Sequence, residues 1–107
     1  MPITDVWFRP NEQGLLDHHT ARLELSKLNP IKANKSVLVR AHLVGLLTSI
    51  PHEWVINDLA EWLLIRPKAR LVFVSDDPLV AEAWEQALAH EVTAIKHARR
   101  GSHAKTK

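Results

Sequence analysis

Two adjacent acidic residues, Asp76 and Asp77, follow an apolar segment and precede Pro78. Ligands of open α/β sheets bind beyond the carboxyl ends of the strands, so this pair could hold a magnesium ion or act as acid and base. A structural role explains the same residues, because Asp favours the N-cap of a helix and Pro its first position. We expect the structural role. A small-ligand site or a metal-dependent hydrolase at the strand ends stays an alternative.

The histidines do not have the spacing of a metal site, although the chain contains seven of them. His18 and His19 are adjacent and would point about 100° apart on a helix, so they cannot easily hold one ion. There is no His-x-x-x-His pair, and the chain has no cysteine. The three glycines are isolated, so phosphate-binding glycine loops are missing as well. The sequence therefore predicts no metal and no cofactor, and catalysis is the weaker class of function.

Three side chains are candidates for contact with a partner or an anion. Arg40 and His42 project from the same face of a predicted strand, and a partly wet sheet face is the favoured explanation of both. Trp54 lies at the polar border of a predicted helix, where an aromatic residue can anchor a contact. A peripheral position in the core is the favoured explanation for this tryptophan.

The charge of the chain is unevenly distributed. The net charge is +2, but residues 96–107 carry five basic and no acidic side chains. The other 95 residues therefore hold nine basic and twelve acidic side chains, a net charge of −3. We expect one domain over residues 1–97 and a basic, disordered tail over 98–107. Through phosphate contacts of Arg99, Arg100, Lys105 and Lys107, this tail could bind nucleic acid.

Hydrophobic periodicity predicts alternating strands and helices. The expected strands cover residues 3–9, 36–44, 69–75 and 92–97, and the expected helices cover 15–28, 52–65 and a segment starting at Pro78. Residues 15–28 also alternate as a strand would, but their composition favours a helix. Residues 69–75 are apolar throughout, which is typical of a central strand covered on both faces.

This order predicts a small α/β domain with a mostly parallel sheet of four to five strands and helices mainly on one face, in β-α-β-α-β-α-β order. No apolar run approaches the roughly 18 residues of a membrane span, so we expect no membrane contact. The first five residues lack the order of a signal peptide, so we expect a cytoplasmic, bacterial protein.

The segments from Val37–Leu43 through RPKARLVFVSDDPLV to VTAIKH resemble the STAS/SpoIIAA-like proteins over residues 36–97. The resemblance implies a sheet backed by helices and a non-enzymatic regulator acting through protein contacts. In anti-sigma-factor antagonists of this family, a turn after the strand carries a phosphorylated serine. The corresponding turn here keeps hydroxyls at Thr48 and Ser49 but lacks the family's Asp and Gly. Phosphorylation of these hydroxyls is therefore a hypothesis, and helix capping is the favoured alternative.

We therefore expect a non-catalytic regulatory or protein-interaction module. Its predicted binding residues are Thr48, Ser49, Trp54, Asp76, Asp77, Arg40 and His42. A protein is the expected partner, and a homodimer is left open. A nucleic-acid-binding accessory protein that uses the basic tail is the alternative.

Overall fold

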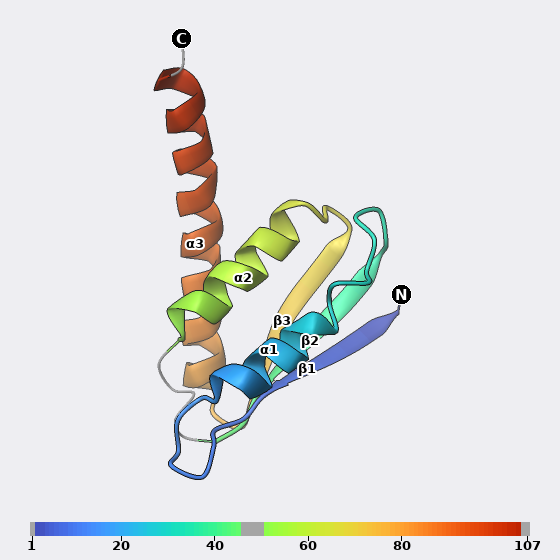
Figure 1. The fold of residues 1–107 in the computed structure, drawn as a ribbon, viewed down its shortest axis with the longest axis vertical. Helices are drawn as coiled ribbons and strands as arrows, with labels where there is room; N and C mark the ends of the chain where they lie inside the picture. Colours follow the sequence, from blue (N-terminus) through green and yellow to red (C-terminus); the bar gives the residue numbers. More distant parts are fainter. Residues whose placement is uncertain (1, 46–50, 106–107) are drawn as a thin grey trace.

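The computed structural model describes residues 2–45 and 51–105, with side chains up to Arg99. The described residues form a three-stranded sheet and three helices, which confirms the α/β class (Figure 1). The strands are β1 (Ile3–Phe8), β2 (Val37–Leu43) and β3 (Ala69–Ser75). The helices are α1 (His18–Ser26), α2 (Glu53–Leu64) and α3 (Pro78–Lys105).

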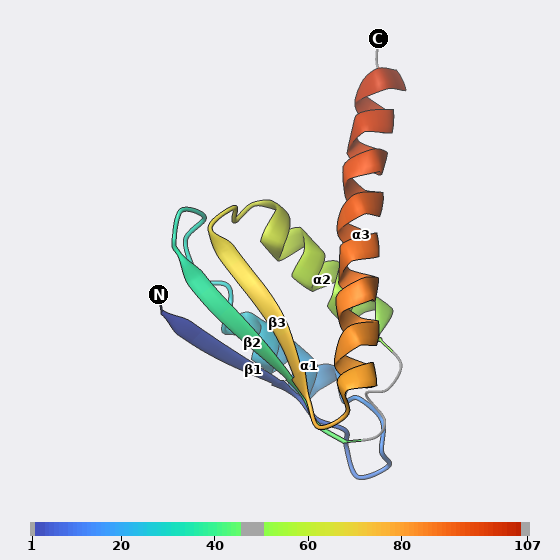
Figure 2. The same ribbon diagram turned by 180° about the vertical axis from the view of Figure 1, so that it is seen from behind.

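The sheet is entirely parallel and its strand order is β1-β2-β3. In Figure 1, α1 and α2 lie over one face of the strands, and α3 stands beside β3. Figure 2 shows the opposite face, where no helix lies in front of the strands. The expected placement of helices mainly on one face is therefore present, and the other face is left without a helix in the described structure.

The ambiguous segment near residue 20 is a helix. The Asp17 carboxylate accepts hydrogen bonds from the backbone N–H groups of His19 and Thr20, at 2.9 and 3.3 Å, and so caps α1. An N-cap aspartate satisfies donors that the first helical turn leaves unpaired. Ala21 is the fully buried residue of this helix. The helical prediction for this segment is confirmed, with bounds inside the expected ones.

The predicted fourth strand, residues 92–97, is wrong: this segment belongs to α3. Val92 and Ile95 are half-buried and continue the stripe of the buried residues Trp84 and Leu88. Their spacing is that of one helical face, and no glycine or proline interrupts the chain between Pro78 and Arg100. The short β-branched run at Val92-Thr93 therefore stays helical.

The predicted central position of residues 69–75 is wrong for the same reason. The expected fourth strand is helical, so β3 is an edge strand of the described sheet, and β2 is the central one. Val72 and Val74 are 38% and 39% exposed on the helix-free face. An uninterrupted apolar run is typical of a doubly covered strand, but here one of its faces has no cover.

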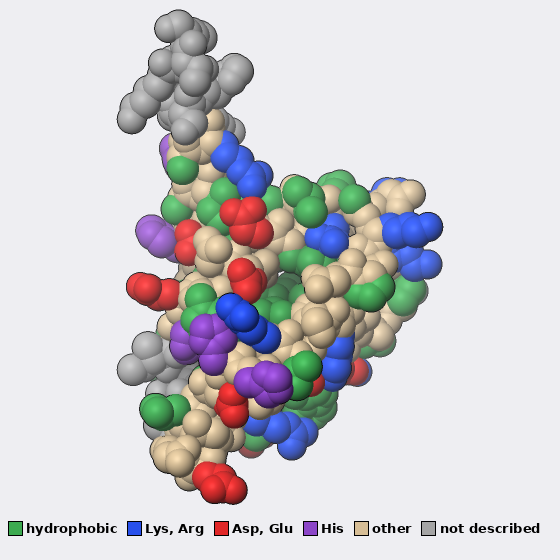
Figure 3. All heavy atoms as spheres, viewed as in Figure 1, with side chains coloured by type: hydrophobic (Ala, Val, Ile, Leu, Met, Phe, Trp, Pro, Cys, Tyr) green, Lys and Arg blue, Asp and Glu red, His purple; other side chains and the backbone are tan. Residues whose placement is uncertain are grey.

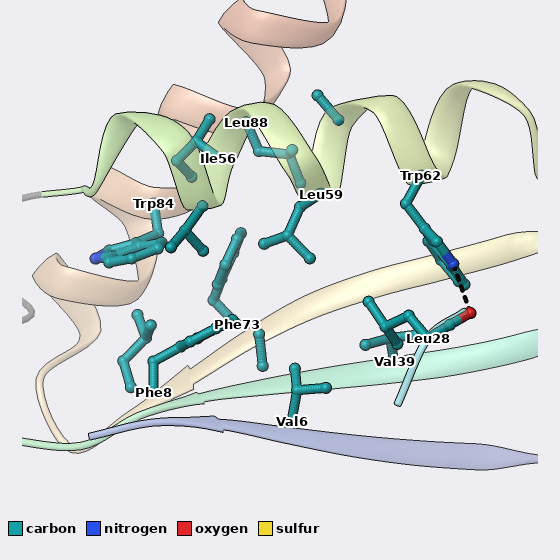
Figure 4. Close-up of a cluster of buried hydrophobic side chains, with 14 of the residues drawn as sticks. Val6, Phe8, Leu28, Val39, Ile56, Leu59, Trp62, Phe73, Trp84 and Leu88 are labelled. Atoms are coloured by element: carbon teal, nitrogen blue, oxygen red, sulfur yellow. Dashed lines mark hydrogen bonds between the residues drawn. The ribbon is translucent and has the colours of Figure 1, made fainter. Parts of the chain in front are cut away.

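The core lies between the sheet and the helices. Figure 4 shows side chains of β1, β2 and β3 meeting those of α2 and α3, with Trp84 close to Phe8 and Phe73. The Trp62 indole N–H donates a 3.1 Å hydrogen bond to the Leu28 carbonyl, which joins α2 to the turn after α1. Trp62 and Trp84 are buried, as the sequence predicts.

Helix α3 extends past the other elements (Figure 1). With this helix included, the molecule measures 50 × 29 × 26 Å along its principal axes. Its helical backbone continues to Lys105. It therefore includes most of residues 98–107, for which the sequence predicts a separate disordered tail. The domain boundary at residue 97 stays a prediction.

Candidate functional site

The strongest candidate site is the helix-free face of the sheet, which we call the open face. Strand side chains alternate between the two sides of a sheet, so every second residue of each strand points away from the core. The register places nine such residues in three rows: Ile3–Leu38–Arg70, Asp5–Arg40–Val72 and Trp7–His42–Val74. These nine residues define the open face.

A polar cluster lies at the centre of the open face. Arg40 donates two hydrogen bonds to the Asp5 carboxylate, from Nε at 2.9 Å and from Nη2 at 3.1 Å. His42 Nε2 lies 2.6 Å from Asp5 Oδ1. Hydrogen bonds from Arg40 and then from His42 lower the pKa of the Asp5 carboxyl group below its ordinary value. Asp5 therefore stays ionised and fixes the orientation of both β2 side chains.

An aromatic stack continues the open face toward the end of β1. The Trp7 and His42 rings are 3.9 Å apart between centroids and nearly parallel, at 8°. The Arg9 guanidinium carbon lies 5.0 Å from the centroid of the Trp7 ring. Stacking and cation–π contacts of this kind each contribute about 0.5–1 kcal/mol at exposed sites. They hold the indole in one orientation, so the face offers a preorganised aromatic group.

Helix α1 closes the outer edge of β1. The Trp7 backbone N–H points away from β2 and donates a 2.8 Å hydrogen bond to Glu24 of α1. Lys27 forms a 2.8 Å ion pair with the same carboxylate oxygen. An edge strand with unpaired backbone groups can pair with other chains, and Glu24 removes one such donor. Binding by strand addition to β1 is therefore less favourable than binding on the open face.

Apart from Arg70, the remaining part of the open face is apolar. Ile3 is 54% exposed, and Val72 and Val74 lie on the opposite border of the same face. All-parallel sheets almost always have both faces covered, because βα units place helices on each side. In the described part of this chain one face has no such cover. The arrangement is therefore suited to binding, with apolar borders around a fixed polar centre.

The sequence identified two members of this site. Arg40 and His42 lie together on the open face, as their alternation along one strand predicts. Asp5, Trp7 and Arg9 were missed as partners, because the pairing of β1 with β2 determines which residues meet. The signal available in the sequence was the alternation of Ile3, Asp5 and Trp7 within a β-prone segment.

Asp76 and Asp77 lie elsewhere, at the carboxyl end of β3. The Asp77 carboxylate accepts a 2.9 Å hydrogen bond from the backbone N–H of Leu79, which is the predicted capping role. Both residues line a shallow cavity of about 160 Å³, together with Leu43, Gly45, Ser75 and Val80. No group of three or more His, Asp or Glu residues that could hold a metal ion occurs among the described residues.

Trp54 lies on α2, on the helix side of the sheet, and packs against the hydrophobic core. It stacks on His18 with 4.2 Å between ring centroids, and it meets His52 edge-on at 5.4 Å. Its indole nitrogen is buried and has no hydrogen-bond partner among the described residues. Trp54 is therefore a half-buried packing residue and is not brought together with Arg40 and His42.

The other predicted site residues fall at the limits of the described structure. Thr48 and Ser49 lie outside the described residues. Arg99 donates a 2.8 Å hydrogen bond to Glu61 of α2, so its charge is already paired. The side chains of Arg100, Lys105 and Lys107 also lie outside the described part.

The helix side of the molecule carries a groove between α1 and α2 of about 630 Å³. Residues of both charges line it, including Arg22, Asp58, Glu61 and Arg66. Figure 3 shows acidic and basic side chains spread over this side of the molecule. The Arg66 guanidinium is already engaged, since it donates to the carbonyls of Ile31 and Trp62. This groove therefore favours no particular ligand charge.

Comparison with models of protein families, with curated proteins and with solved structures finds no match to this chain. In the described residues, no helix is both long enough and apolar enough to span a membrane.

Proposed function

We propose that this chain is a non-catalytic regulatory or protein-interaction module that binds a partner protein through the open face. One observation carries the proposal: an all-parallel sheet is covered by helices on one side, while its other side exposes Ile3, Val72 and Val74. Covering these side chains gives a favourable free energy of about 25 cal/mol per Å² of apolar surface. A partner that supplies the missing cover therefore gains stability from contacts that the chain alone does not make.

The composition of the open face supports a protein as the partner. Its nine residues include one tryptophan, two arginines and one histidine, and none of them is lysine or glutamate. Interfaces are enriched in aromatic residues and arginine and depleted in lysine and glutamate. Trp7 is the natural anchor, because it is held in place by His42 and Arg9.

The size of the open face predicts the strength of binding. Three strands of about seven residues present roughly 300 Å² in projection, at about 4.8 Å between strands and 3.3 Å per residue. A standard interface buries about 800 Å² per partner. We therefore expect reversible binding with a Kd in the micromolar range. An interaction role also follows from the resemblance to STAS/SpoIIAA-like regulators, and the proposal does not depend on that resemblance.

Site-specific photocrosslinking tests the proposal. A photoreactive amino acid replaces Val72 on the open face, and in a matched control it replaces Glu85, an exposed residue of α3. In cells of the source organism, we expect a crosslinked protein from position 72 and none from position 85. Adding Val74→Asp should abolish the product from position 72. Equal products from both positions, or a product that survives Val74→Asp, would exclude the open face as the interface.

A further inference from the structure

The charges of the open face and its border are not all available to a partner. Arg40 is neutralised by Asp5 through two hydrogen bonds. Arg70, on the open face, and Arg9, just beyond its third row, are both exposed, and neither forms an ion pair with a described residue. The surface therefore presents two unpaired positive charges at its border, while residues 1–95 as a whole carry a net charge of −3.

The two arginines lie at diagonally opposite corners. Arg70 shares a row with Leu38 and Ile3, and Arg9 follows six residues after Ile3 along the direction of β1. Six residues span about 20 Å along the strands, and two strand spacings span about 10 Å across them. The Cα atoms of Arg9 and Arg70 are therefore roughly 22 Å apart, on either side of the apolar and aromatic residues.

The dimensions fit one helix. The three strands are about 10 Å wide between the outer two, which matches the 10–12 Å diameter of an α-helix with its side chains. The faces of parallel sheets in α/β proteins are covered by helices that run nearly along the strands. At 1.5 Å per residue, a separation of roughly 22 Å corresponds to about 15 residues of helix.

We infer that the partner contributes an amphipathic helix, whose apolar stripe covers the open face and whose carboxylates, about four turns apart, pair with Arg9 and Arg70. The inference rests on the proposed function and specifies the partner of the same surface. Such a helix gives the sheet a helical layer on its second side. Its negative charges complement the two unpaired arginines at the border, where interfaces are polar.

Two other occupants fit the open face less well. A second copy of the chain, stacked face to face, would bring four unpaired arginines together without added carboxylates, and like charges repel. A single-stranded nucleic acid needs free aromatic faces and several cations. Here the Trp7 ring is already in contact with His42 and Arg9, and Arg40 is paired with Asp5.

The test uses three labelled helical peptides of about 20 residues, a length of about 30 Å as a helix. They share one leucine stripe and differ at two positions fifteen residues apart, which carry Glu, Gln or Lys. Fluorescence anisotropy measures their binding to the full chain at low salt and at ~150 mM salt. We expect the Glu peptide to bind about 3- to 10-fold more tightly than the Gln peptide at low salt, because two exposed ion pairs form.

Charge reversal supplies the decisive comparison. The double variant Arg9→Glu, Arg70→Glu should prefer the Lys peptide over the Glu peptide. The matched control, Arg22→Glu with Lys96→Glu, makes the same change of net charge at exposed positions on α1 and α3 and should keep the preference for Glu.

Two results would overturn the inference. One is equal binding of the Glu and Lys peptides, or no binding of either. This result would overturn the inference even if photocrosslinking from position 72 supported the proposed function. The other is binding of a single-stranded oligothymidine at ~150 mM salt that Arg9→Glu, Arg70→Glu abolishes, which would make the surface a nucleic-acid site.

Discussion

At the scale of single residues, the open face carries two kinds of charge: those paired within the chain, and those that could pair with a partner. Asp5 accepts from Arg40 and lies against His42, so this carboxylate organises two side chains of the neighbouring strand. His42 in turn stacks on Trp7, which Arg9 also contacts. A chain of contacts thus runs from Arg40 to Arg9 across two strands. It holds the aromatic group in place in the free chain, which would lower the entropy cost of binding a partner.

The pKa of Asp5 tests this arrangement. Arg40 is the largest cause of its lowered value, so Arg40→Met should raise the pKa of Asp5 toward the ordinary 3.8, and by more than His42→Phe does. A lowered pKa in the folded state stabilises the fold above pH 3.8, and this contribution is lost as the pH falls through the folded value. NMR titration of the Asp5 carboxyl carbon measures the pKa, with Arg22→Met as the control. An unchanged pKa in Arg40→Met would contradict the described ion pair.

At the scale of elements, sequence patterns predicted the helices and strands where one periodicity was clear. Residues 52–65 and 36–44 became α2 and β2 because their apolar stripe and their alternation each continue over the whole segment. The prediction of a fourth strand was wrong, because Val92 and Ile95 continue the apolar face of a helix that already includes Trp84. Without a fourth strand, β3 lies at the edge of the described sheet and not at its centre as predicted.

The candidate site was only half predictable for a related reason. Arg40 and His42 share one strand, so their common face follows from their spacing. Asp5 and Trp7 meet them through the register of β1 against β2, and neither strand contains a local signal that determines this register. The exposure of Val72 and Val74 follows from the lack of a helix over that face in the described structure, which the apolar run of residues 69–75 does not reveal.

Two tryptophans of α2 connect this helix to the two ends of α1 in different ways. Trp62 donates to the Leu28 carbonyl after α1. Trp54 instead stacks on His18 at the start of α1, and its indole N–H has no acceptor in the described part of the chain. Both replacements by Phe lose ring volume, but only Trp62→Phe loses a hydrogen bond. We expect Trp62→Phe to lower the free energy of unfolding by about 1–2 kcal/mol more than Trp54→Phe does. Denaturant unfolding measures the difference, and equal losses would contradict it.

At the scale of the whole molecule, two groups of positive charge bear on the choice of partner. The unpaired arginines at the border of the open face belong to the folded body, and the other concentration of positive charge lies in residues 96–107 at the end of α3. These two places correspond to the two classes of partner that the sequence left open. A protein partner would use the open face, and a nucleic acid would use the end of α3.

Truncation of the chain distinguishes the contributions of these two places to binding. Removing residues 100–107 deletes Arg100, Lys105 and Lys107 and changes the net charge from +2 to −1. It keeps the Arg99–Glu61 ion pair, the last one described along α3. Because an exposed ion pair contributes only about 0–1 kcal/mol, even Arg99→Ala should change the stability little, and the truncated chain should unfold within about 0.5 kcal/mol of the full chain.

The same truncation should leave the Kd for the Glu peptide within about twofold at ~150 mM salt, where charges more than about 8 Å apart are screened. An oligothymidine titrated into both chains at this salt concentration should bind neither of them tightly, because residues 1–95 hold twelve acidic against nine basic side chains. Tight binding to the full chain that disappears with residues 100–107 would establish the end of α3 as a nucleic-acid site. If the truncated chain no longer bound the Glu peptide, the protein interface would instead lie on α3 and away from the open face.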